Sequence, residues 1–388
     1  MLGLILACMD AVVNALTDAS RKKVLDQQFD AGLISVWCKV ISCVLFGLVI
    51  GVLYLVWGTH PHLPDIGKGF GLSPQISFLL YISLNAVLEG TAILLNLRAL
   101  QVSPISYCVP FMALTPLFLM PGGAIFLHEA ISSGMIIGVA MVVIGSLVVN
   151  RQMFAKGPLE PARAILRERG SRYMVFVAFL LTITNVLDKW FLTTGGGAES
   201  FDMKLSRSLT LSAGKCAMLT VFFIGLTIFR LGQWKSSKVS PAGWVRAAAS
   251  FSWTNVFRQT PGWLILAGVF EALVLMLMLT AMQFTVAAVV ISIKRAGVIV
   301  AVGLGWLMFK ERGLTDRIIA SLVMGSGVVI FFLTKPDVSG QSILGPGGAL
   351  MVAAFTLVVM ALALYLTRHH YLKTGSQPRT AASAEGVE

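Results

Sequence analysis

Long apolar stretches, separated by short polar segments, recur along the whole chain. Each is about 20 residues long, the length that an α-helix needs to cross a hydrocarbon core roughly 30 Å thick. No stretch is left over for a separate soluble domain, so we expect an all-α, polytopic membrane protein. The pattern predicts eleven spans, over residues 1–17, 31–57, 75–97, 103–127, 131–150, 173–193, 208–229, 261–283, 286–309, 318–334 and 346–367.

The composition agrees with this interpretation. The mean hydropathy is +0.83, and only 12% of the residues are charged, against roughly 25% in soluble domains. The first apolar stretch, Met1 to Leu16, lacks a basic start and contains Asp10, so it fits a span better than a cleaved signal peptide. We expect a multi-pass protein of the cell inner membrane.

Lysines and arginines alternate between rich and poor loops. Of the 30, 21 follow odd-numbered spans or lie in the tail, and 4 follow even-numbered spans. Because cytoplasmic loops carry the excess of these residues, the amino terminus is predicted outside and the tail in the cytoplasm. The same bias explains the net charge of +12 better than nucleic-acid binding does.

An internal repeat appears when residues 87–148 are laid without gaps on residues 269–330. Glu89 then meets Glu271, and Glu129 meets Glu311. Upstream the offset drifts, but Lys39 and Lys215 still occupy almost equivalent positions. Other matches are Ala99 with Ala281, Gln101 with Gln283, Asn14 with Asn185, Cys38 with Cys216 and Gly145 with Gly327.

The repeat predicts the domain organisation. We expect a first five-helix repeat over residues 1–150, a basic loop over 151–172 and a second five-helix repeat over 173–334. Residues 335–388 would hold an extra helix and a disordered tail. Since five is odd, the second copy enters the membrane from the opposite side, and such inverted repeats commonly build transporters.

Two stretches resemble a known family. Residues 99–149 are similar to the EamA-type unit of the drug/metabolite transporter superfamily, on Pro104, Pro116, Glu129, Gly138 and Gly145. Residues 281–333 resemble its second copy, on Phe309, Lys310, Glu311, Arg317, Gly325 and Gly327. The resemblance implies a ten-helix bundle with a central cavity for a transported solute.

The chain departs from that family in two respects. The eleventh apolar segment, Pro346 to Thr367, is one that such families generally lack. Many members also have both termini in the cytoplasm, an arrangement that a further helix before Met1 would restore.

Lys294 and Arg295 are the first candidate binding residues. With Phe309 and Glu311 after them, they resemble the pair by which the triose-phosphate and nucleotide-sugar translocator branch holds a phosphate. Two cations inside a span need a partner, water or a bound anion. The alternatives are an ion pair with Glu271 or Glu89, or side chains that reach the membrane surface.

Glu89 and Glu271 are candidates for solute or proton binding. Tyr81, Asn85, Glu89 and Asn96 share one helical face, which must line protein or water. An acid there could carry the proton of a proton-coupled cycle. The alternative for both glutamates is a buried, hydrogen-bonded acid that fixes helix packing.

Lys215 is a further candidate ligand. Ser208 and Ser212 share its helical face. Aspartates and asparagines in the first and sixth spans are expected near helix ends, where capping is as well supported as solute contact. They are Asp10, Asn14, Asn185 and Asp188.

Prolines and glycines interrupt two corresponding spans, the fourth and the ninth, and suit a moving gate or ordinary helix packing. They are Pro104, Pro110, Pro116, Pro121, Gly297, Gly303 and Gly305.

A secondary transporter of a small, anionic solute, bearing a phosphate or a carboxylate, is the function that the sequence favours. A flippase for a lipid-phosphate headgroup would use the same basic residues. A membrane-embedded enzyme is less well supported, because no cluster of acids or histidines lies at a membrane face. We expect no cofactor, metal site, catalytic residue or nucleic-acid partner; the partners are the solute and the bilayer, with a homodimer left open.

Overall fold

The computed structural model describes a bundle of helices, and no strand occurs among the described residues. Those are residues 2–25, 31–57, 63–64, 71–102, 112, 114–149, 169–194, 200–236, 261–297, 300, 314–334, 345, 347–348 and 350–358. The helices are α1 (Leu2–Leu25), α2 (Ala31–Trp57), α3 (Pro74–Val102), α5 (Leu114–Leu127), α6 (Ser133–Val149), α8 (Arg169–Thr193), α9 (Phe201–Ser236), α12 (Pro261–Phe284), α13 (Ala287–Ala296) and α15 (Leu314–Thr334).

Each of the eleven predicted spans overlaps a described helix, the last of them through residues 347–348 and 350–358. Within the described part of the chain, six helices are long and apolar enough to cross a bilayer: α1, α2, α3, α8, α9 and α12. The prediction of an all-α, polytopic membrane protein is confirmed. Shorter apolar helices cover Leu114–Leu127, Ser133–Gly145 and Leu322–Thr334.

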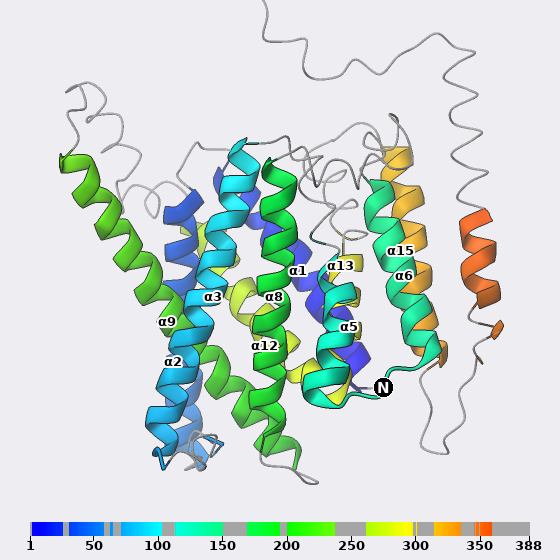
Figure 1. The fold of residues 1–388 in the computed structure, drawn as a ribbon. Coiled ribbons are helices and arrows are strands. Elements are labelled where there is room, and N and C mark those ends of the chain that lie inside the picture. Colours follow the sequence, from blue (N-terminus) through cyan, green and yellow to red (C-terminus); the bar gives the residue numbers. More distant parts are fainter. Residues whose placement is uncertain are drawn as a thin grey trace, which may run out of the picture.

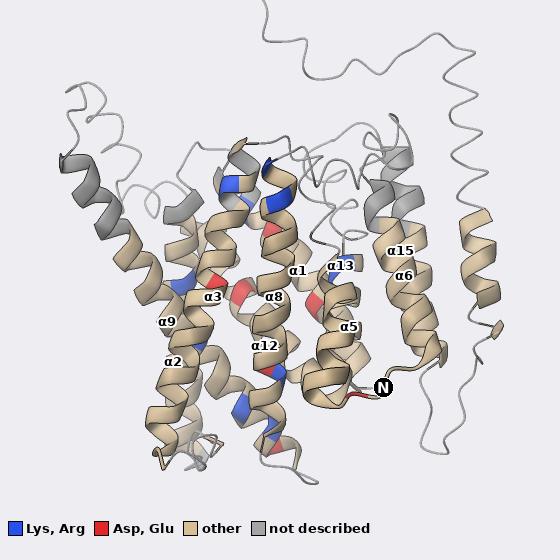
Figure 2. Cartoon of the chain, in the orientation of Figure 1, with Lys and Arg blue, Asp and Glu red and all other residues tan. Residues whose placement is uncertain are grey.

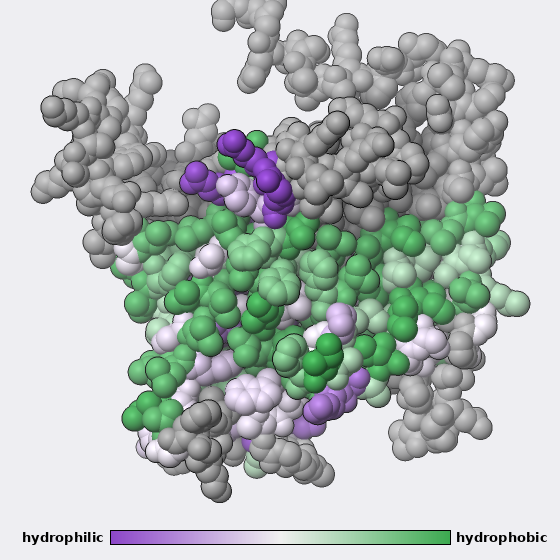
Figure 3. Space-filling view, in the orientation of Figure 1, coloured by the Kyte–Doolittle hydropathy of each residue, from purple (hydrophilic) through white to green (hydrophobic). Residues whose placement is uncertain are grey.

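A belt of apolar side chains covers the middle of the bundle, and polar residues gather toward its ends (Figure 3). On α2, Leu48, Val52 and Leu55 are exposed, as a lipid-facing side requires. Helices are the form that such spans must take, because lipid offers no partner to backbone N–H and C=O groups.

Several helices extend further than the apolar pattern indicates, and α1 and α9 show why. Helix α1 continues to Leu25, and α9 begins at Phe201, because polar residues in the added turns find partners inside the bundle. Arg21 is paired with Glu271. The Lys204 carbonyl accepts a hydrogen bond from Gln283 Nε2 at 2.7 Å.

Consecutive helices run in alternating directions, and neighbours in space come from distant parts of the chain (Figure 1). Helix α1 packs along α12, α3 along α8, and α6 along α15. The start of α1 meets the end of α12, where Gly3 lies against Phe284.

The most extensive helix contacts are matched when the two predicted halves are exchanged. In repeat order α1 corresponds to α8 and α12 to α3, so the α1–α12 contact is the counterpart of the α8–α3 contact. Helix α2 packs on its own counterpart α9, α5 on α13, and α6 on α15. An inverted repeat would produce this pattern, and the repeat boundaries themselves remain a prediction.

Both interrupted spans are partly described. Pro121 lies inside α5, and α13 ends at Ala296 with Gly297 as its C-cap. Other predictions fall outside the described residues: Pro104, Pro110, Gly303, Gly305 and Glu311, residues 151–168 of the basic loop, and the tail after Arg368.

Candidate functional site

Charged residues occur part-way along the helices of the bundle, not only at their ends (Figure 2). One group forms around Glu271 of α12. Its Oε2 lies 2.6 Å from Arg21 Nη2 of α1, and its Oε1 lies 2.7 Å from Lys39 Nζ of α2. We call Arg21, Lys39 and Glu271 the Glu271 centre; it holds one acid and two cations.

Close packing of α2 on α12 brings Lys39 to Glu271. A Cβ added to Gly268 would lie 2.7 Å from the Ile41 side chain, so only glycine allows this approach. Ser42 donates a hydrogen bond to the Gly268 carbonyl at 2.8 Å. Glu271 follows Gly268 by three residues, about one helical turn, and so lies on the same face.

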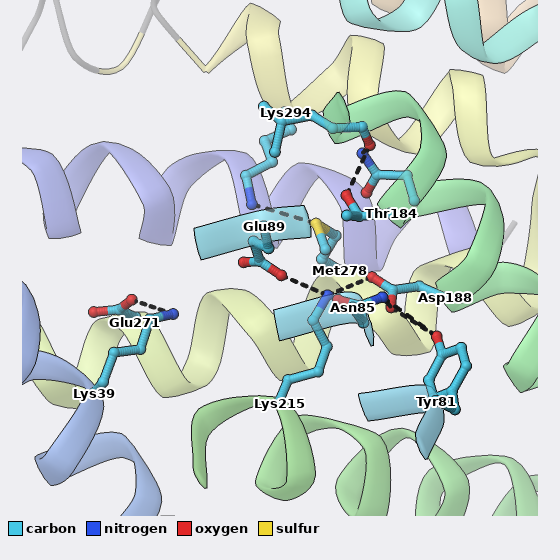
Figure 4. A network of polar contacts seen from close by, with 12 residues as sticks. Lys39, Tyr81, Asn85, Glu89, Thr184, Asp188, Lys215, Glu271, Met278 and Lys294 are labelled. Atoms are coloured by element: carbon cyan, nitrogen blue, oxygen red, sulfur yellow. Dashed lines mark hydrogen bonds and ion pairs between the residues drawn. The ribbon is translucent and has the colours of Figure 1, made fainter. Parts of the chain in front are cut away.

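A second group forms around Lys215 of α9. Its Nζ lies 2.9 Å from Glu89 Oε2 of α3 and 2.5 Å from Asp188 Oδ2 of α8. Asp188 Oδ1 accepts hydrogen bonds from Tyr81 at 3.0 Å and from Asn85 at 2.8 Å. Figure 4 shows these side chains converging from the three helices. We call Glu89, Asp188 and Lys215 the Lys215 centre; it holds two acids and one cation.

The two centres correspond under the sequence repeat. Glu271 matches Glu89, and Lys39 matches Lys215 approximately. In each centre a lysine of one half binds a glutamate of the other half, at 2.7 Å and 2.9 Å. The ion pairs therefore join the two predicted halves at two places.

The third member of each centre differs in sign. Arg21 gives the Glu271 centre an excess of one positive charge, and Asp188 gives the Lys215 centre an excess of one negative charge. The two centres together are neutral when all six groups are ionised.

Lys294 and Arg295 lie in the last turn of α13. Lys294 Nζ is 3.7 Å from Asp10 Oδ1 and 3.4 Å from the sulfur of Met278. The Arg295 Nε is buried and has no hydrogen-bond acceptor among the described residues. Of the cations predicted to bind the solute, Lys294 and Arg295 have the weakest contacts to acceptors among the described residues.

Glu129, which follows α5, and Lys189 of α8 form a further ion pair beside the link between α12 and α13. Lys189 also donates a hydrogen bond to the Thr285 carbonyl at 2.6 Å. Glu129 Oε1 accepts one from the Ala287 N–H at 3.3 Å. The pair therefore connects the turn after α5 to α8 and to the link between α12 and α13.

The shared face of Tyr81, Asn85 and Glu89 is confirmed, since all three lie in the network around Asp188 and Lys215. Lys215 lies there too. The roles proposed for these residues in binding are not tested by their geometry alone.

One alternative interpretation of Lys294, and the placement of two aspartates near helix ends, are wrong. The proposed ion pair of Lys294 with Glu271 or Glu89 does not form, because those acids are taken by other cations and Lys294 faces Asp10. Asp10 and Asp188 do not cap helix ends, since both lie well inside α1 and α8 and are fully buried.

Sequence reasoning missed Arg21 as a site residue and underestimated Asp188. The predicted first span ends at residue 17 and so places Arg21 in a loop, whereas α1 continues to Leu25. The sequence did contain a signal for Asp188. An acid inside a predicted span needs a partner, and Lys215 is a basic residue inside another predicted span.

Residues 1–151 match the model of the EamA-like transporter family. This is 151 of 388 residues, and it covers the whole of the predicted first repeat. A search of curated proteins found no match. A solved structure described only as "Crystal structure of protein" has a TM-score of 0.54 and 14% identity, over 86% of this chain and 96% of that chain. That likeness concerns the fold alone.

Proposed function

We propose that the chain is a secondary active transporter that moves a small solute by alternating access between its two halves. The observation that carries the proposal is the pair of ion pairs, Lys39 with Glu271 and Lys215 with Glu89. Both are buried within helices that the repeat relates, and both join one half to the other. The family match over residues 1–151 supports the same function.

Buried ion pairs that cross between halves suit a moving protein. Each charge is costly in the membrane unless it is paired, so a state with broken pairs forms only if other partners replace the lost ones. An inverted repeat offers two related arrangements of the same contacts. The ion pair of one centre can then break while the ion pair of the other centre remains.

The solute that the site favours is an anion, with a phosphate or carboxylate group, as the resemblance of Lys294 and Arg295 to a phosphate-binding pair suggests. A guanidinium presents a planar fork to oxyanions, and an ammonium adds a point charge. Arg295 Nε has no acceptor among the described residues, and the nearest acid to Lys294 is at 3.7 Å. A bound oxyanion would satisfy both.

A thermal-shift screen of the purified protein tests the solute class, because a ligand that binds the native state raises its melting temperature. The panel contains phosphorylated metabolites, carboxylates, nucleotides, amino acids and cationic drugs, with a lipid phosphate in mixed micelles as a separate arm. We expect stabilisation by a soluble anion. Stabilisation by the lipid phosphate alone would favour a flippase, and stabilisation by cationic drugs alone would contradict the anion site.

The double variant Lys294→Gln with Arg295→Gln assigns the response to these residues. It should lose at least tenfold in affinity for the stabilising anion, while Arg169→Gln with Arg172→Gln, which removes two exposed arginines, should bind normally. If the cations serve only to pair with Asp10, then Asp10→Asn with Lys294→Gln should bind as the wild type does. Unchanged binding in both Lys294 variants would remove the anion site.

A further inference from the structure

The Lys215 centre contains an unequal number of acids and cations. Glu89 and Asp188 both contact the one ammonium group, at 2.9 Å and 2.5 Å. The Asp188 side chain is 1% exposed and that of Lys215 is 4% exposed, so water does little to screen the two carboxylates. Within this centre one negative charge therefore has no cation of its own, and a positively charged ligand would balance it there.

The groups that face this acid pair from neighbouring helices do not supply the missing charge. Lys39 of α2 is held by Glu271 at 2.7 Å, and Lys294 of α13 faces Asp10. Glu271 of α12 adds negative charge. The titratable groups that remain nearby are the Tyr81 hydroxyl, which already donates to Asp188, and the Cys216 thiol of α9. Among the described residues, Lys215 is the only cation in an ion pair with Glu89 or Asp188.

An unused hydrogen-bond acceptor points to the kind of ligand. Asn85 Nδ2 donates to Asp188, whereas Asn85 Oδ1 is fully buried and receives no hydrogen bond. Glu89 Oε2 lies 2.9 Å from the Lys215 ammonium, which it shares with Asp188. The centre therefore lacks a donor as well as a positive charge. A carboxylic acid O–H supplies both, because a protonated acid is one donor and carries no charge.

We propose that Glu89 and Asp188 together bind one exchangeable proton, which leaves Lys215 paired with a single carboxylate. The proton comes from the aqueous phase and returns to it. With the proton bound, the Glu271 and Lys215 centres together carry one positive charge instead of none, so an anion entering between the halves is neutralised. This inference rests on the proposed function and deepens it, since it makes proton and anion binding mutually favourable.

Glu271 is excluded from this role by the same count. It faces two cations, Arg21 and Lys39, and its protonation would leave two unpaired positive charges. The sequence made Glu89 and Glu271 equal candidates for proton coupling, and the geometry distinguishes them. Glu271→Gln is therefore the matched control for Glu89→Gln and Asp188→Asn.

Infrared difference spectroscopy of the full-length protein in lipid, with pH as the only variable, measures the proton directly. The probe is the C=O stretch of a protonated carboxylic acid and its shift in deuterated water. We expect a pH-dependent acid band in the wild type and in Glu271→Gln. The band should be lost or shifted in frequency in Asp188→Asn and in Glu89→Gln. Lys215→Met, which leaves two acids without their ammonium, should retain the band to higher pH than the wild type.

Folding and ion identity are controlled in the same samples. If a single variant unfolds, we replace it with the double variant Asp188→Asn with Lys215→Met, which removes one charge of each sign. The wild-type band should be absent from this double variant. An unchanged band in folded Asp188→Asn and Glu89→Gln, or its loss in folded Glu271→Gln, would overturn the proposal. Loss of the band in sodium chloride, but not in choline chloride, would indicate a sodium site and would also overturn the proposal. No solute is used, so failure here leaves the transport proposal to its own test.

Discussion

Glu271 binds two cations at once, and this makes it a more important residue for stability than its repeat counterpart. Glu271→Gln leaves Arg21 and Lys39 without an acid, whereas after Glu89→Gln the Lys215 ammonium still has Asp188. Removing one partner of a buried ion pair costs about 3–5 kcal/mol. We expect Glu271→Gln to lose about 3 kcal/mol of unfolding free energy, because Arg21 is partly exposed, and Glu89→Gln to lose less.

Equilibrium unfolding of the purified protein in detergent checks this order. Lys39→Met with Glu271→Gln should recover part of the loss, since only the more exposed Arg21 is then unpaired. Equal losses for Glu89→Gln and Glu271→Gln would show that the second acid of the Lys215 centre does not compensate.

The sequence predicted the site best where its members share one helix. Tyr81, Asn85 and Glu89 are four residues apart, and a helix places such residues on one face. Spacing within a helix says nothing about which other helix that face meets. For this reason Asp188 was expected at a helix end, although it lies between Tyr81, Asn85 and Lys215.

At the scale of the helix, Gly268 controls the distance between α2 and α12. Its added Cβ would lie 2.7 Å from Ile41, and overpacking of this kind costs typically 1–3 kcal/mol. We expect Gly268→Ala to lower the melting temperature and to weaken the Lys39–Glu271 coupling in a double-mutant cycle.

Gly262→Ala is the matched control, because a Cβ there meets nothing within 4 Å on the same helix. Ile41→Val with Gly268→Ala should recover part of the stability. If Gly262→Ala and Gly268→Ala have equal effects, helix propensity and not close packing accounts for the change.

The Glu129–Lys189 pair connects three elements, and the two residues are not equivalent within it. Lys189→Met leaves the Glu129 carboxylate buried without its cation, whereas Glu129→Gln retains an oxygen that can accept from Ala287. We expect Lys189→Met to be the more destabilising change, by more than about 1 kcal/mol. Unfolding measurements on both variants and on the double variant check this, and the reverse order would show that the Thr285 contact matters little.

The element boundaries show what an apolar pattern can and cannot predict. Each of the eleven predicted spans overlaps a described helix, because a helix satisfies its backbone hydrogen bonds internally, as lipid requires. The ends of α1 and α9 were misplaced because charged residues there continue the helix once partners are available. Arg21 is an example: its partner Glu271 lies 250 residues away, and local hydropathy carries no sign of it.

At the scale of the whole molecule, the alternating loop charges predict the orientation in the membrane. The starts and ends of successive helices alternate between the two ends of the bundle, as that prediction requires. Reporter fusions after Lys156 and Gly375 should both behave as cytoplasmic, and a fusion after Gly196 should lie outside. The opposite pattern would reverse the orientation and leave the fold unchanged.

The central claim is that the solute crosses between the halves and is held there by Lys294 and Arg295. Counterflow in proteoliposomes, with the anion that most stabilises the purified protein, tests it most directly. We predict accumulation of labelled solute by the wild type and by Arg169→Gln with Arg172→Gln. The same assay should show none with Lys294→Gln and Arg295→Gln combined, although that variant remains folded. Counterflow that is absent from the wild type, or unchanged in the Lys294 and Arg295 double variant, would contradict the account.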